Sequence, residues 1–322
     1  MTLRARAVCL ARLLLSLIVL APALGGGAAF AAPREVRFGC FVTSISNLSP
    51  ADGSFRMVVY IWTVDPAGTF DPATDLQVLA RESQITAATR TTLPDGSVHA
   101  AAVVDATVDH AYDVRAYPFD RETLRLRFES VEDSTELVFV PDGADSRIAD
   151  FVELPGWHID RLDIDAEPHR YDTGFGHRID LPTFSRVSVD VHVARNRSPL
   201  LLGKFTGFLI AFVITAMVYA VPPGELGVRL GMTTGSIFSA VFNRYRLEDS
   251  IGFDAAFGLA DETTLLISSV ILVTLVLSIV SHQRLQRTED KAAVVRADRR
   301  LGAAVILIHL ALFALAFGVA LA

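Results

Sequence analysis

Residues 187–210 read VSVDVHVARNRSPLLLGKFTGFLI, and this stretch divides the chain into two parts. Before Ala194, apolar and polar residues alternate, as they do in a strand that has one face in a core and one in water. From Pro199 onward the residues are mostly apolar, as in a helix that crosses a bilayer. Only a few residues connect the two, so we expect a stiff junction through which the first part can act directly on the helix.

The part before the junction carries the pattern of a β-protein. Short alternating stretches recur, for example in Met57–Trp62 and Leu124–Phe128, and turn signals such as Pro94-Asp95-Gly96 separate them. We therefore expect residues 32–198 to form an antiparallel β-sandwich. Between Pro33 and Pro199 there are 27 acidic and 16 basic residues. This balance fits a solvated exterior, or a vestibule whose walls gather cations.

The part after the junction, residues 199–322, is expected to be a transmembrane domain of four helices. Each expected span has about 20 residues, which is the length that a helix needs to cross the hydrocarbon of a bilayer. The expected spans are residues 200–221, 226–245, 263–281 and 301–322.

The N-terminus and one loop predict the orientation in the membrane. Residues 1–31 have basic residues, then an apolar run and then Ala29-Phe30-Ala31, as in a secretory signal peptide. The alternative is an uncleaved first transmembrane helix. Residues 282–300 contain six lysine or arginine residues and should form a cytoplasmic loop. Both features place the sandwich outside the cytoplasm.

Composition excludes several classes of protein. Apolar residues make up 51% of the 322 residues, and the mean hydropathy is +0.41, which argues against a soluble enzyme. The net charge of −7 argues against a nucleic-acid partner. Cys40 is the one cysteine outside the leader, so we expect no internal disulfide and no cysteine-based metal site. We expect no catalytic residues, no metal and no cofactor.

The stretch Asp113–Asp120, DVRAYPFD, followed by Glu122-Thr123-Leu124, resembles the signature loop of the pentameric ligand-gated ion channels, especially their prokaryotic branch. Trp62 on an early strand and the four expected spans fit the same family. The two loop cysteines of animal members correspond to His110 and Leu124, so the disulfide is absent. We expect packing of the loop residues to hold it instead, with Pro118 fixing a turn that can contain a cis peptide bond.

The resemblance implies a homopentameric channel in the inner membrane of a bacterium, with the sandwich in the periplasm. A small-molecule agonist, or protons, is expected to open a pore for inorganic ions. His110, His177 and the acidic rim supply titratable groups for proton gating. The alternative is a non-conducting membrane receptor of the same fold.

The second span is the expected pore helix, because it is too polar to face lipid. The structural alternative is a small-residue packing helix with Gly-x-x-x-Gly spacing. Two registers are open. The preferred one lines the pore with Gly231, Gly235, Phe238, Phe242, Tyr245 and Asp249, in which the phenylalanines form a hydrophobic gate. The other lines it with Arg229, Thr233, Ser236, Ala240 and Asn243.

The ends of the pore carry three charged residues, Glu225, Arg229 and Asp249. Glu225 near the cytoplasmic mouth favours cations, but Arg229 lies four residues on. The two are expected to form an i, i+4 ion pair, which leaves the selectivity open.

The resemblance also implies a coupling site and a ligand site. Asp120 is expected to pair with Arg197 or Arg195 in a geometry that differs between closed and open states; the alternative is a surface ion pair of little weight. The coupling residues are Tyr117, Pro118, Phe119, Asp120, Arg195 and Arg197, with Arg244, Arg246, Glu248 and Asp249 after the second span. The ligand hairpin is expected at residues 170–177, with Tyr171, Phe175, His177 and, with less support than a core position, Trp157.

Overall fold

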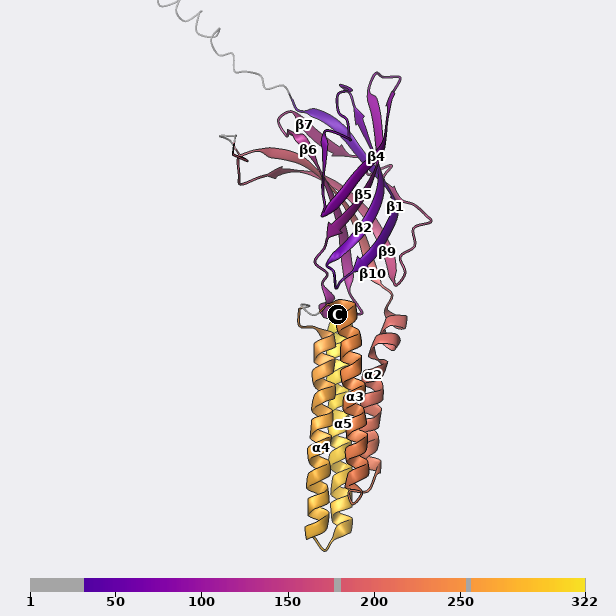
Figure 1. Cartoon of the computed structure of the whole chain (residues 1–322), viewed down its shortest axis with the longest axis vertical. Coiled ribbons are helices and arrows are strands. Elements are labelled where there is room, and N and C mark those ends of the chain that lie inside the picture. Colours follow the sequence, from indigo (N-terminus) through magenta and orange to yellow (C-terminus); the bar gives the residue numbers. More distant parts are fainter. Residues whose placement is uncertain (1–31, 177–180, 253–255, 322) are drawn as a thin grey trace, which may run out of the picture.

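In the computed structural model, two β-sheets form the N-terminal part of the described chain and four long helices form the C-terminal part (Figure 1). The structure describes residues 32–176, 181–252 and 256–321. The expected signal peptide lies outside these residues. The C-terminal end of the last helix lies at the junction between the sheets and the helices (Figure 1).

The first sheet has the order β4-β5-β2-β1-β7, and β8 also pairs with β1. Its strands are β1 (Arg34–Ser49), β2 (Ser54–Asp65), β4 (Glu82–Thr92), β5 (Val98–Asp109), β7 (Leu137–Pro141) and β8 (Arg147–Ile148). The second sheet has the order β3-β6-β10-β9. Its strands are β3 (Leu76–Leu79), β6 (Arg121–Asp133), β9 (Trp157–Arg170) and β10 (Thr183–Arg195).

The two sheets pack face to face around an apolar core. The ring of Phe38 on β1 lies 5.2 Å from the ring of Phe128 on β6 and 5.5 Å from that of Phe139 on β7. The alternating residues of β6 and β10 point their apolar side chains into this core, as the sequence pattern predicts. The described residues therefore contain a β-sandwich.

The expectation that the sandwich is wholly antiparallel is wrong in one place. β7 and β8 both pair with β1 in parallel. The chain leaves β6 in the second sheet, turns at Asp133–Glu136 and crosses to the first sheet, so β7 enters in the direction of β1. Alternation of apolar residues reports which face is buried, and it carries no information about the direction of the neighbouring strand.

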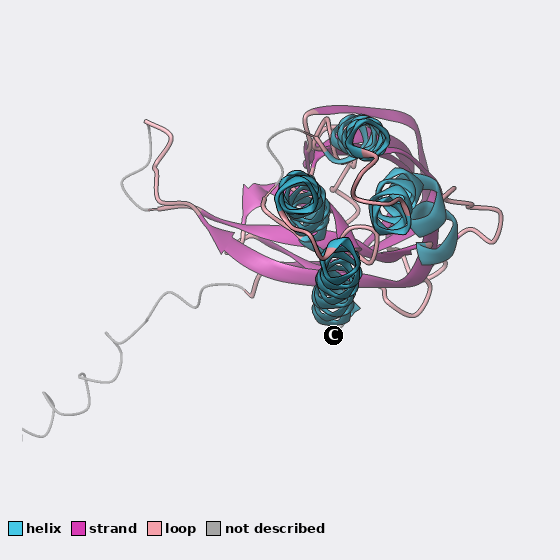
Figure 2. Ribbon diagram, turned by 90° about the horizontal axis from the view of Figure 1, so that it is seen from below, coloured by secondary structure: helices cyan, strands magenta, loops and turns pink. Residues whose placement is uncertain are grey.

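The helical part consists of α2 (Arg197–Met217), continued by the 3-10 turn η3 (Val218–Ala220), then α3 (Leu226–Ile251), α4 (Leu259–Arg287) and α5 (Lys291–Leu321). Among the described residues, three segments are long and apolar enough to cross a membrane, namely Leu201–Ala220, Leu259–Arg287 and Lys291–Leu321. The more polar α3 packs against α2 and α4, and α5 packs against α4 (Figure 2).

The helices extend beyond the expected spans. α3 continues to Ile251 rather than ending near Tyr245, and α4 and α5 take up nearly all of the expected loop 282–300. Only Thr288–Asp290 connect these two helices. A hydropathy window detects the apolar length of a helix, whereas charged residues outside that length are still good helix formers.

The signature loop lies between the sandwich and the helices. It contains the 3-10 turn η2 (Val114–Ala116), followed by a cis peptide bond between Tyr117 and Pro118. Val114 and Tyr117 are buried in the same apolar cluster as Phe205 of α2 and Leu247 of α3. The loop is thus part of the helical core, although its ends belong to the sandwich.

Candidate functional site

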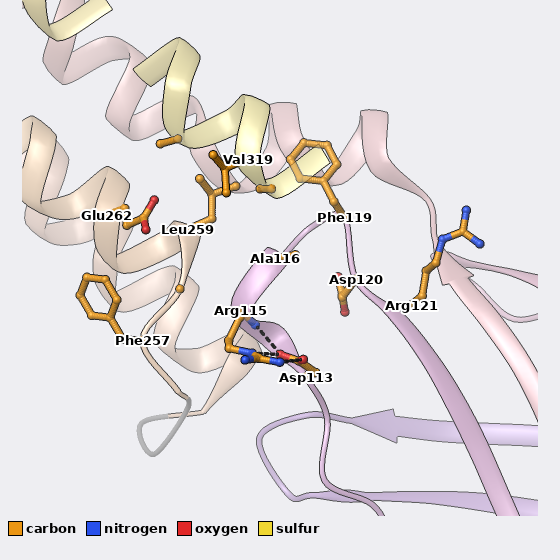
Figure 3. Close-up of a pocket in the computed structure, with 13 residues that line it drawn as sticks. Asp113, Arg115, Ala116, Phe119, Asp120, Arg121, Phe257, Leu259, Glu262 and Val319 are labelled. Atoms are coloured by element: carbon orange, nitrogen blue, oxygen red, sulfur yellow. Dashed lines mark hydrogen bonds and ion pairs between the residues drawn. The ribbon is translucent and has the colours of Figure 1, made fainter. Parts of the chain in front are cut away.

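The tip of the signature loop contacts two helices, α4 and α5. A Cβ added to Gly258, just before α4, would lie 2.5 Å from the Cα of Arg115, so this close approach requires glycine. The Phe119 ring packs edge-on against Phe317 of α5, with ring centroids 6.3 Å apart. Figure 3 shows Phe119 beside α5 and Arg115 beside the start of α4. The loop therefore has contacts that can transmit movement to both helices.

A cavity of about 570 Å³ lies beside this contact (Figure 3). Charged side chains line its sandwich wall, and the opposite wall is formed by apolar residues of α5 and by the start of α4, including Glu262. Arg115 at its edge is held by Asp113, whose Oδ1 accepts a hydrogen bond from Arg115 Nε at 2.8 Å. This bond lowers the pKa of Asp113 below its ordinary value, so both residues are charged at neutral pH.

Asp120 and Arg195 form the buried ion pair at the base of the loop. Arg195 Nε lies 2.8 Å from Oδ1 and 2.9 Å from Oδ2 of Asp120. The Asp120 side chain is 0% exposed and that of Arg195 is 9% exposed. The guanidinium carbon of Arg195 also lies 4.0 Å from the Trp157 ring and 4.8 Å from the Tyr117 ring. The two rings hold the cation, and Asp120 supplies its counter-charge.

Of the two arginines expected to pair with Asp120, the structure selects Arg195. The side chain of Arg197 lies outside the described residues. The charged residues near the C-terminal end of α3 were expected to meet Asp120, but the structure pairs them with other groups. Arg244 pairs with Glu248 and with Asp261 of α4. Arg246, also near the end of α3, donates to the carbonyl oxygen of Gly203. Asp249 is exposed.

One face of α3 is open in the single chain, and it carries the preferred pore register. Phe238, Phe242 and Tyr245 have exposed fractions of 58%, 63% and 60%. Gly231 and Gly235 lie on the same face and are exposed too. The phenylalanine rings stack with their centroids 6.3 Å apart. These positions are available to line a pore, to contact a neighbouring subunit or to face lipid.

The opposite face of α3 carries the alternative register, and it is buried inside the subunit. Arg229, Thr233, Ser236, Ala240 and Asn243 all belong to this buried face. Because these side chains face the other helices of the same chain, the alternative register is wrong for this conformation.

The packing of α3 on α2 accounts for some of these buried polar groups. Asn243 Oδ1 accepts a hydrogen bond from the backbone N–H of Gly207 at 3.1 Å, and the Ser239 hydroxyl donates to the Gly207 carbonyl at 2.8 Å. A Cβ at Gly207 would lie 2.6 Å from Asn243 Oδ1. Polar residues on α3 therefore serve helix packing as well as any contact with water.

The expected ion pair between Glu225 and Arg229 is not formed, because Arg229 has a different partner. Its guanidinium bonds to Asp298 of α5, with Nη1 3.0 Å from Oδ1 and Nη2 2.6 Å from Oδ2. It also donates to the carbonyl oxygen of Val221. Both charged side chains are buried, so Arg229 does not lie at an open mouth and does not pair with Glu225, which is exposed. Asp298 was missed because the sequence places it in a loop, whereas the extended α5 brings it to α3.

The ligand hairpin holds a small aromatic pocket of about 280 Å³. The Tyr171 ring packs against Phe175 and Phe184, with centroid separations of 5.2 and 5.9 Å. The Tyr171 hydroxyl donates to Glu129 Oε1 at 2.8 Å, and Arg186 donates to Glu129 Oε2 at 2.9 Å. Burial and the neighbouring carboxylate raise the pKa of Tyr171. Tyr171 and Phe175 thus lie together as expected, with Glu129 and Arg186 as further lining or supporting residues.

The other two expected ligand residues lie elsewhere or outside the description. Trp157 begins β9, which has 14 residues, and Tyr171 directly follows its end. At about 3.3 Å per residue they lie roughly 45 Å apart along the strand. Trp157 packs on Arg195 and belongs to the apolar core, and it does not line the Tyr171 pocket. His177 lies outside the described residues.

No protein-family model matches the chain, and no curated protein matches it.

Proposed function

We propose that the protein is a ligand-gated ion channel of a bacterial inner membrane, formed by five copies with α3 of each around a central pore. An agonist that binds at the Tyr171 pocket moves the sandwich, and the signature loop transmits this movement to the helices. Protons are the second candidate agonist. The sandwich lies in the periplasm.

The observation that carries the proposal is the open face of α3. This helix is the least apolar of the four, yet between Gly231 and Tyr245 its exposed face holds Gly231, Gly235, Phe238 and Phe242 and no charged residue. Small residues let helices come close to a narrow axis, and aromatic rings at a constriction can exclude water when it closes. A symmetric ring of five such faces buries the aromatic residues and makes one gated pathway.

The ion pair between Arg229 and Asp298 supports a cation preference. Because Asp298 neutralises Arg229 inside the subunit, exposed Glu225 supplies an uncompensated charge at the start of α3. Five copies would place five carboxylates at the cytoplasmic mouth. The acidic sandwich also favours cations, because it raises their concentration near the outer end of the pore.

Recordings from purified protein in planar bilayers test this function. Steps in pH and a panel of small amines should evoke currents, and a gradient of potassium chloride should give a reversal potential on the cation side. Glu225→Gln should move that potential toward zero, while the matched change Glu289→Gln in the turn between α4 and α5 should leave it unchanged. Absence of current under every condition, with pentamers present by mass measurement, would favour the non-conducting receptor.

A further inference from the structure

A third cavity, of about 750 Å³, opens at the edge of the sandwich and is next to the Tyr171 pocket along the paired strands β3 and β6. It lies where β3 ends and the chain crosses from the second sheet to the first, and the end of β5 and the first half of β6 complete its walls. The volume is within the range of about 300–1,000 Å³ that is typical of small-molecule sites.

The charge of this cavity is opposite to that of the domain. Its lining includes three guanidinium groups, from Arg81, Arg125 and Arg127, and one carboxylate, from Asp109. The sandwich as a whole has an excess of acidic residues. A concentrated positive site within an acidic domain is the arrangement that selects an anion from solution.

Arg127 is the central residue of this site. Among the described residues, its side chain has no hydrogen-bond or ion-pair partner, although it is half-buried. Burial, together with the guanidinium groups of Arg125 and Arg186, lowers the pKa of Arg127 below its ordinary value, although the carboxylates of Asp190 and Glu167 act in the opposite direction. A bound anion would relieve this repulsion and satisfy the free donors of Arg127.

The other two arginines are already held in place. Arg125 binds both oxygens of Asp190 through Nε and Nη2, at 2.7 and 2.6 Å, which leaves its Nη1 group outside that pair. Arg81 Nε donates to Asp109 Oδ1 at 2.7 Å. Guanidinium groups that are fixed in this way lose little freedom when a ligand arrives, and their planar donors match carboxylate and phosphate oxygens.

We propose that this cavity binds a small anion that presents carboxylate or phosphate oxygens, and that Arg127 is its principal contact. Arg81 and Arg125 are already paired with Asp109 and Asp190, so among the described residues Arg127 carries the uncompensated positive charge of the site. Arg125 and Arg81 supply further donors at the walls. The site does not depend on conduction or on the number of subunits, so it stands apart from the proposed channel function.

Thermal unfolding of the full-length protein in detergent tests the proposal, with succinate and inorganic phosphate as probes and sodium chloride added to match ionic strength. At least one probe should raise the melting temperature in a saturable manner, and the tighter probe identifies the preferred oxygen chemistry. Arg127→Gln removes charge-assisted hydrogen bonds and should raise the half-saturating concentration roughly tenfold or more. Arg127→Lys should retain part of the binding.

Arg56→Gln is the matched control. Arg56 also lies on a strand of the sandwich and pairs with a carboxylate, Asp105, but it does not line the cavity. This variant should bind the probe as the wild type does. Asp109→Asn gives a second test, since loss of the carboxylate in the lining should tighten binding. A response that never saturates, or an equal half-saturating concentration in wild type and Arg127→Gln, would overturn the proposal.

Discussion

The buried pair between Asp120 and Arg195 gives the sharpest prediction, for the variant Asp120→Asn. The change keeps the size of the side chain and removes its charge. The Arg195 guanidinium then stays between the Trp157 and Tyr117 rings, at 4.0 and 4.8 Å, without a counter-ion. Its Nη2 atom is buried and has no hydrogen-bond acceptor among the described residues even in the intact pair, so loss of Asp120 adds to a deficit that is already present.

The magnitude follows from the burial. Removing one partner of a buried ion pair costs about 3–5 kcal/mol. The two rings contact the guanidinium in the wild type and in the variant alike, so they leave this difference unchanged. We therefore expect Asp120→Asn to lower the free energy of unfolding by about 3–5 kcal/mol. The matched control Asp105→Asn breaks an exposed pair with Arg56 and should cost about 0–1 kcal/mol.

Two measurements on the same samples separate a structural role from a coupling role. Thermal unfolding in detergent reports stability, and currents from reconstituted protein report gating. The account predicts a large loss of stability together with a shift of the agonist response to higher concentration, because the loop contacts both α4 and α5. A melting temperature equal to that of Asp105→Asn would refute the reasoning about the buried charge. An unchanged agonist response would remove Asp120 from coupling.

Three further predictions concern other parts of the molecule. Asp298→Asn should destabilise the protein by about 3–5 kcal/mol by leaving Arg229 buried and unpaired, and the charge-free double variant with Arg229→Met should recover much of this in thermal unfolding. Gly258→Val should displace the signature loop, because its side chain overlaps the backbone of Arg115, and a reduced maximal current with normal assembly would show it. Burial raises the pKa of the Asp65 carboxyl, but hydrogen bonds from backbone N–H groups of the turn after it outweigh burial and lower this pKa. The stabilisation of the fold by the ionised carboxylate is therefore complete above its ordinary pKa and is lost as the pH falls below that value. Asp65→Asn should therefore lower the melting temperature at pH 7 and flatten its acid dependence; an unchanged slope between pH 7 and 3 would contradict this.

The sequence was informative wherever a pattern is local. Alternation predicted the strands, and the junction at Pro199 predicted where the helices begin. The direction of β7 could not be predicted, because it depends on a crossing between sheets. The same limit applied to helix ends: apolar length defined the expected spans, whereas Lys291–Asp298 continue α5 beyond the apolar run.

The candidate site also combines residues that a local sequence pattern could indicate with partners that only tertiary packing could identify. The resemblance of the signature loop indicated Asp120 and offered two arginines, and the strand register of β10 brings Arg195 to it, opposite Trp157 of β9. The partner of Arg229 is 69 residues away in sequence, so only tertiary packing could identify it. The pairing of Arg186 with Glu129 across β10 and β6 was also beyond a single-strand pattern.

The most direct test of the central proposal is the accessibility of single cysteines on α3 to a charged, water-soluble thiol reagent during current recording. The background is Cys40→Ala, since Cys40 is the free cysteine of the described chain. Phe238→Cys and Gly235→Cys should be modified from the aqueous side, faster with agonist, and modification should change the current. Leu307→Cys on the exposed face of α5 should not react, because the proposed arrangement places that face in lipid. If the α3 cysteines stay unmodified, or react no faster than Leu307→Cys, then α3 does not line a water-filled pathway.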